Sequence, residues 1–458
     1  MKKVFILFAL IASLTSQAQS EGFRTFSLKQ AIEYGVQNNI SAKNAKLSEK
    51  EAKARNHELL SIGLPQLNGN FDFTYYILKP TSPAFSSSFD VSSLANLPPP
   101  LDALGKAFPS KFYIALHNNV GTGVNFTQMI YDTRFFIGIQ TFKKLIQVSQ
   151  LQTSLTEQDV RYNIIKGYSQ TQSAKEILRY LDSSLVILNK LRDDTRATYQ
   201  AGLIEENDVD RIELGISNLQ SQINNTRNLY ELSLAALKYN MGLHLTDNIA
   251  LTDDIEALRN QMNEVLPDHF DPSQRIENDL LQAAVELKNF DRKQKKAGYY
   301  PSLTALGNLG AGAQTDHFNN IFHVDSRTWY SQSYVGFTLR VPIYDGGQKE
   351  AAVKQARLEV EKAKNDLENF QSQSTLQVNA AKVTFGNNLG EEQNAKRSMM
   401  LNNKIFGKTQ IKFKEGVSSS FELIQTQQDQ TTNMIRYYNA MRSVLESRAD
   451  LDKALGIK

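Results

Sequence analysis

The sequence predicts a mostly α-helical protein built from long antiparallel coiled-coil hairpins, with β-strands of the kind that build a transmembrane β-barrel. Three observations lead to this fold class. Residues 133–243 have the pattern of two long helices joined at a glycine-containing turn. The same order of elements recurs in the second half of the chain. Segments in which apolar and polar residues alternate precede each hairpin, and a period of two indicates a half-buried strand.

The composition narrows the class of protein further. The chain has 458 residues, a formal charge of +3 and no cysteine. These values argue against a nucleic-acid partner, a disulfide framework and a thiolate metal site. The mean hydropathy is polar at −0.40, yet the chain holds 24 Phe and 18 Tyr. No stretch after the N-terminus offers the ~20 apolar residues of a membrane helix. A membrane barrel fits this combination better than a helical membrane protein does.

The N-terminus predicts a secretory signal peptide over residues 1–18. Lys2 and Lys3 form its basic start, and the apolar run Val4–Leu14 follows. The run is too short for a spanning helix, so we expect the mature chain to begin near Gln19. No cysteine follows that position, which argues against an N-terminal lipid anchor.

Residues 19–243 are predicted to form the first of two repeats. Ser27 is the expected N-cap of its opening helix, because serine accepts hydrogen bonds from the first turn of a helix. The expected elements are a helix at 27–62, strands at 66–78 and 111–131, and a long helical hairpin at 133–243. The first helix of that hairpin would be roughly 100 Å long.

The returning arm of this hairpin carries a heptad seam, with an average spacing of ~3.5 residues. A coiled-coil dimerisation arm is an alternative interpretation of the stretch taken alone. The seam residues are Ile212, Ile216, Leu219, Ile223, Thr226, Tyr230, Ser233 and Leu237.

The second half repeats this plan after a connector at residues 244–271. Its landmarks keep register: the strand-ending tyrosines 131 and 344 are 213 residues apart (344 minus 131), and the tip glycines 202 and 416 are 214 apart (416 minus 202). Such an offset indicates an internal duplication. The expected elements of the second repeat, 272–458, are a helix at 273–297, strands at 301–311 and 331–343, and a helical hairpin at 346–458.

The four expected strands have one apolar and one polar or small face. In the last strand, for example, Val335, Phe337 and Leu339 alternate with small or polar residues. Segments of about ten residues with this alternation are typical of a transmembrane barrel. A soluble sheet packed on the helices is the alternative. Because four strands leave two edges that lipid does not tolerate, a membrane sheet of this size has to oligomerise.

No catalytic constellation is evident. The six histidines are scattered along the chain and lack metal-ligand spacing. Residues 307–312 are glycine-rich but lie inside a strand pattern and lack the Lys and Ser/Thr of a phosphate loop. We therefore expect no enzyme activity, cofactor or metal.

These features together resemble the TolC-like outer-membrane efflux protein family. The matching motifs are Leu64-Pro65-x-Leu67 before a strand, Tyr131-Asp132 before a long helix, Tyr199-x-x-Gly202-Leu203 at a hairpin tip, and Asn240-Met241-Gly242-Leu243 at a hairpin end. The resemblance implies a homotrimer in which four strands per chain build one 12-stranded barrel and the long helices form a periplasmic α-barrel. It also implies a passive exit duct in the outer membrane, serving a tripartite efflux or type I secretion system. Its partners would be a periplasmic adaptor (membrane fusion) protein, an inner-membrane transporter of the RND or ABC type, and outer-membrane lipid. A structural periplasmic coiled-coil protein without transport activity is the alternative.

Each tip glycine is followed six positions later by an acid, Asp208 in the first repeat and Glu422 in the second. Rings of carboxylates favour cations, so we hypothesise that both acids line a periplasmic gate. Alternatively, they are ordinary solvated acids at helix starts, where the helix dipole favours negative charge.

The resemblance implies a gate tyrosine, a gate arginine and a second acid at positions that here hold Phe413, Ser418 and Gln425. The locking bonds of the family would therefore be missing, and Lys414 is the candidate substitute. The hairpin tips Gly202-Leu203 and Gly416-Val417 are the expected docking surface for the adaptor.

Overall fold

The computed structural model describes residues 24–83, 111–262, 265, 269–323 and 328–457. The expected signal peptide and most of the long loop after residue 79 lie outside the described residues. The chain divides into two compact units, and each unit takes segments from both halves of the sequence. The helical unit comprises the described residues up to Ala52, Leu145–Glu286 and the described residues from Glu361; the sheet unit comprises Lys53–Lys144 and Leu287–Val360.

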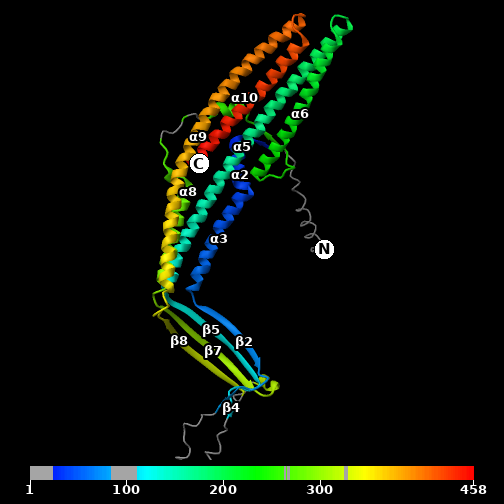
Figure 1. The fold of residues 1–458 in the computed structure, drawn as a ribbon. Coiled ribbons are helices and arrows are strands. Elements are labelled where there is room, and N and C mark those ends of the chain that lie inside the picture. The colour runs from blue at the N-terminus through cyan, green and yellow to red at the C-terminus, as the bar shows by residue number, and fades with distance from the viewer. Residues whose placement is uncertain (1–23, 84–110, 263–264, 266–268, 324–327, 458) are drawn as a thin grey trace, which may run out of the picture. The chain divides into compact units, whose positions relative to one another are not determined.

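Two long hairpins supply most of the helical unit (Figure 1). The first is formed by α5 (Thr133–Gln200) and α6 (Glu206–Met241), and the second by α9 (Gln348–Lys414) and α10 (Ser420–Leu455). Among the described residues, no helix combines the length and apolarity needed to cross a membrane.

Each hairpin turns at a glycine in the left-handed region, Gly202 with φ +75° and Gly416 with φ +71°. At the first turn, the Leu203 N–H donates to the Thr198 carbonyl and the Gly202 N–H to the Tyr199 carbonyl. This pair of bonds is the Schellman arrangement, which satisfies the last carbonyls of a helix and needs a residue without a Cβ at the positive φ.

The heptad seam of α6 is buried inside the chain. Ile212, Leu219, Ile223 and Leu237 are all 4% exposed or less, and burying each such side chain contributes about 1.5–3 kcal/mol. The first three of them form one apolar cluster with α5 and α10 side chains, including Leu423. The seam therefore packs the two hairpins of one chain together, and it is not an exposed dimerisation stripe.

The opening helix is interrupted, so the expectation of one helix over 27–62 is wrong. The structure has α2 (Leu28–Asn38) and α3 (Ile40–Ile62), separated at Asn39, whose backbone is extended. The Asn39 side chain accepts from the Ser41 N–H at 2.8 Å and so starts a new helix. Ser27 caps α2 as expected, in a reciprocal capping box with Gln30.

The segment between the halves is packed against the hairpins. Strand β6 (Ile249–Leu251) pairs in parallel with β1 (Arg24–Phe26), and the short helix α7 (Ile255–Gln261) follows. The buried Tyr168 hydroxyl of α5 donates to the Phe26 carbonyl at 3.0 Å. The chain then continues through a 3₁₀ turn into α8 (Ile276–Ala297).

The sheet unit contains one four-stranded sheet in the order β2-β5-β7-β8 (Figure 1). Every neighbouring pair is antiparallel. Both β2 and β8 lie at an edge, and no other described strand pairs with their outer sides. The strands are β2 (Gln66–Tyr75), β5 (Asn118–Asp132), β7 (Ser302–Thr315) and β8 (Trp329–Arg340).

The expected single strand at 111–131 is wrong, because the structure divides it. Its start is the short β4 (Lys111–Tyr113), which pairs with β3 (Thr81–Pro83), and β5 begins only at Asn118. Between them, the His117 N–H donates to the Asp316 carboxylate at 3.2 Å, so the backbone bonds there to a loop side chain. The strand expected at 331–343 ends early, at Arg340, since Pro342 cannot donate to a strand ladder.

The two faces of the sheet differ in chemistry. One face exposes large apolar side chains, including Phe71 at 71%, Val335 at 80% and Phe337 at 71%. The opposite face carries a ladder of amides that crosses three strands. Asn308 donates to Asn125 at 2.8 Å, and Asn125 donates to Asn70 at 2.9 Å. A sheet with a bare apolar face and a hydrogen-bonded polar face matches the chemistry of a barrel wall.

Glycines let the strands of this sheet approach closely. A Cβ on Gly310 would lie 2.7 Å from the Thr122 carbonyl oxygen, and a Cβ on Gly312 would lie 2.7 Å from the Tyr330 ring. The first contact is with backbone, which a side chain could not displace without shifting a strand, whereas the second would require the Tyr330 ring to move. The glycine-rich run at 307–312 therefore has a packing role in the sheet.

Candidate functional site

The hairpin tips, residues 201–205 and 415–419, lie at the same end of the helical unit (Figure 1). Helix α6 begins at Glu206 and α10 begins at Ser420. Asp208 and Glu422 are therefore both the third residue of a return helix. The two acids have equivalent helical positions, but their surroundings differ.

Asp208 is bonded across to the other hairpin. The Ser420 hydroxyl of α10 donates to Asp208 Oδ1 at 2.5 Å, and Ser420 is only 1% exposed. Asp208 is half-buried. We call this hydrogen bond the tip tie. Ser420 is a residue that the sequence reasoning missed, because nothing in the spacing of either repeat indicates that these two helix starts touch.

Two further contacts continue this line of packing between α6 and α10. The Arg211 guanidinium lies over the Phe421 ring at 5.6 Å. One turn further on, a Cβ on Gly215 would lie 3.0 Å from the Ile424 Cδ1 atom. The start of α6 therefore packs closely against the start of α10, and the tip tie sits at the end of that contact.

Glu422 is bonded within its own tip. Its Oε2 accepts from the Ser418 hydroxyl at 2.7 Å, and its backbone N–H donates to the Ser419 hydroxyl at 3.2 Å. Ser419 is thus the N-cap of α10. Gln425, one turn along, donates to Asp429 at 3.3 Å. Both Glu422 and Gln425 are exposed.

A hollow of about 670 Å³ opens between the two tips. Phe413 lines it while also packing on the apolar cluster of the hairpins, so its ring serves as part of the core. Lys414 lines the same hollow and is exposed. At the outermost turns, Leu203 is 75% and Val417 is 76% exposed. The tips therefore present two bare apolar side chains, one from each turn.

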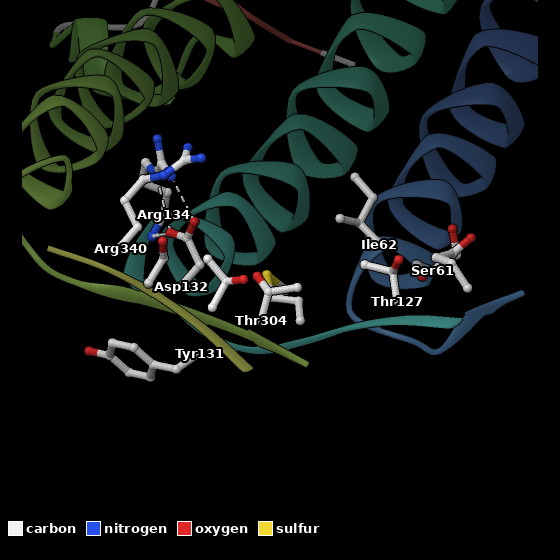
Figure 2. A pocket seen from close by; sticks show the side chains of 12 residues that line it. Ser61, Ile62, Thr127, Tyr131, Asp132, Arg134, Thr304 and Arg340 are labelled. Carbon is white, nitrogen blue, oxygen red and sulfur yellow. Dashed lines mark hydrogen bonds and ion pairs between the residues drawn. The ribbon is translucent and has the colours of Figure 1, made fainter. Parts of the chain in front are cut away.

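A second cavity, of about 670 Å³, lies in the sheet unit (Figure 2). We call it the sheet cavity. Most of the residues that the strands contribute to its lining are polar. The lining also contains an ion pair, in which the Asp132 carboxylate accepts from the Arg134 guanidinium at 2.8 Å. The lining residues are Ser61, Ile62, Gln66, Thr127, Met129, Tyr131, Asp132, Arg134, Ser302, Thr304, Thr338 and Arg340.

The described residues contain no cluster of three or more His, Cys, Asp or Glu side chains arranged to hold a metal ion.

Comparison with known proteins agrees with this geometry. Residues 277–457 match the family model described as outer membrane efflux protein. The chain is 20% identical over 333 residues to the outer membrane protein TolC of Vibrio cholerae, which covers 72% of this chain and 74% of that protein.

Two solved channels have the same fold. The outer membrane channel CmeC of Campylobacter jejuni is 17% identical, with a TM-score of 0.70 over 94% of this chain and 85% of that one. The open-state MtrE channel of Neisseria gonorrhoeae is 15% identical, with a TM-score of 0.69 over 94% and 88%. The sequence matches and the shared fold together show that this chain resembles the TolC-like outer membrane efflux proteins.

Proposed function

We propose that this chain is the passive outer-membrane exit duct of a tripartite efflux or type I secretion system, with a large periplasmic portion and a gate at the periplasmic end. The proposal rests above all on one observation: a four-stranded sheet with one bare apolar face and two edges that no other described strand covers. The family match over residues 277–457 supports it independently.

The sheet requires partners of its own kind if it spans a membrane. Val335, Phe337 and Leu339 of β8 are each more than 60% exposed, which is unfavourable in water and favourable against lipid. Lipid leaves no water for an unpaired strand edge, and known single-chain barrels begin at eight strands. Three copies that pair β2 of one chain with β8 of the next would close a 12-stranded barrel. The internal two-fold repeat would then supply each chain with two strand pairs and two hairpins.

The gate would lie at the hairpin tips. In a homotrimer, Asp208 and Glu422 would bring six carboxylates to one mouth, and Gln425 would add a neutral amide beside them. The tip tie from Ser420 would hold the two hairpins of each chain together in the closed state. It takes the place of the tyrosine and arginine bonds that Phe413 and Ser418 cannot make.

The hairpin tips also suggest which proteins this chain binds. The apolar turns Gly202-Leu203 and Gly416-Val417 suit docking by the helical hairpin of a periplasmic adaptor, because exposed apolar side chains mark interaction sites. An inner-membrane transporter of the RND or ABC type would supply the energy. Adaptor binding would select the open state by its higher affinity for untied tips.

Planar-bilayer conductance of the purified protein tests this proposal. The variant is Asp208→Ser combined with Glu422→Ser, and the matched control is Glu231→Ser, which removes an exposed acid of α6 away from the tips. We expect small, cation-preferring wild-type currents that rise and lose cation preference in the double variant only. Equal currents in all three proteins would move the gate elsewhere. A folded, membrane-inserted sample that conducts no current would favour a structural scaffold instead.

A further inference from the structure

The polar face of the sheet carries a single basic side chain. Arg340 is the only Lys or Arg in strands β2, β5, β7 and β8. It is the last residue of β8 and is exposed. Its register partner on β7 is Ser302, and Thr338 faces Thr304 two residues before it. Arg340 therefore shares the polar face with these hydroxyls, opposite to the face of Phe337 and Leu339.

Arg340 brings an uncompensated positive charge to the sheet cavity. Ser302 pairs with Arg340 on one side and with Asp132 on the other, so the three residues form one row. The Asp132 carboxylate is already engaged by Arg134, through its side chain at 2.8 and 3.2 Å and its backbone N–H at 2.8 Å. Arg340 makes no hydrogen bond or ion pair with any described residue.

Figure 2 shows the side chains of Arg134 and Arg340 extending to the same part of the cavity. The remaining lining contains further hydroxyl donors, those of Thr127, Thr304 and Thr338. Helix α5 starts at Thr133, directly beside Asp132, and a helix N-terminus adds positive potential. One carboxylate, two guanidinium groups and a helix start leave the cavity net cationic.

From this arrangement we propose that the sheet cavity is a binding station for an oxyanion, a carboxylate or phosphate group of the exported molecule, held by Arg340. The inference rests on the proposed duct, in which the polar face lines the lumen. Three copies would then place three Arg340 guanidinium groups at one height, each able to bind an oxyanion with two parallel N–H bonds. The duct would thus have a ring of carboxylates at the tips and a ring of guanidinium groups at the sheet.

Citrate and tripolyphosphate are suitable probes, because one presents carboxylates and the other phosphates. Each is added to the barrel side of the wild-type channel in a bilayer of neutral phosphatidylcholine. We expect either or both to reduce the current, and Arg340→Gln to raise the half-blocking concentration at least about tenfold, since hydrogen bonds to charged groups are lost. Arg340→Lys should retain most of the block. The matched control is Lys293→Gln, which removes an equal charge from the exposed surface of α8 in the same unit.

Calorimetric titration of the same probes into detergent-purified protein separates this inference from the proposed duct. Binding that depends on Arg340 without any conductance would support the station and count against the duct. Conductance with equal block in wild type and Arg340→Gln would keep the duct and overturn the station. An effect of Arg340→Gln that depends on added anionic lipid and not on the probes would also overturn it, because Arg340 would then contact lipid phosphate.

Discussion

Removing the tip tie is the sharpest test of the proposed gate. Ser420→Ala deletes the hydroxyl that donates to Asp208 Oδ1 at 2.5 Å and leaves the backbone of α10 unchanged. A hydrogen bond to a charged group contributes about 1.5–3 kcal/mol. Its loss should therefore shift the balance between tied and untied tips by roughly 10-fold to 150-fold per chain. We expect higher open occupancy in single-channel recordings of Ser420→Ala.

A double-mutant cycle assigns this effect to the bond itself. Asp208→Ala and Ser420→Ala should each raise the open occupancy, and the double variant should add little to either, because both remove the same interaction. Ser418→Ala is the matched control, since its hydroxyl bonds to Glu422 within one tip and ties no second helix. Additive effects of the two tip-tie variants, or an equal effect of Ser418→Ala, would refute the reasoning.

Three other predictions concern the sheet, the tips and the pH dependence of stability. Gly310→Val should prevent formation of the proposed trimer, measured as a band of trimer mass on native electrophoresis, because its Cβ would meet a neighbouring carbonyl. Gly69→Val should assemble normally, because a Cβ at Gly69 has open space around it. Leu203→Asp combined with Val417→Asp should leave the melting temperature unchanged but weaken adaptor binding in a pull-down; unaltered binding would exclude the tips as the docking surface. Burial raises the pKa of Glu446, so the folded state holds this proton more tightly than the unfolded state. Its contribution to stability is then greatest at acid pH and falls as the pH rises from the ordinary glutamate pKa through the raised one. Glu446→Gln should flatten that part of a melting-temperature profile, and an unchanged slope would contradict the assignment.

Local pattern was sufficient for most of the elements. The helix seam of α6 follows from the spacing of Ile212, Leu219 and Ile223, because a helix repeats its buried face every 3.6 residues whatever it packs against. The turns follow from Gly202 and Gly416, since a positive φ favours glycine. The position of Ser27 as a helix cap also follows from local sequence, because its side chain bonds to Gln30 in the first turn of the same helix.

The incorrect predictions lie where a contact with a distant residue competes with the local pattern. The expected strand at 111–131 breaks because His117 bonds to Asp316, almost two hundred residues away. The expected helix at 27–62 breaks at Asn39, whose side chain also donates to the Asn240 carbonyl at 2.7 Å. No window of sequence contains both partners of either contact, so periodicity alone could not place these breaks.

The sequence by itself determined most of the elements, their order and the resemblance to a family of channels. Only the tertiary structure decided which side chains meet. Asp208 was predicted from its spacing to a tip glycine, but its bond to Ser420 depends on how two hairpins pack. Arg340 lies within the strand expected at 331–343, and only the strand register aligns it with Ser302 and Asp132. The physical reason is that helix and strand periods act over a few residues, whereas a site is assembled from elements that are far apart in the chain.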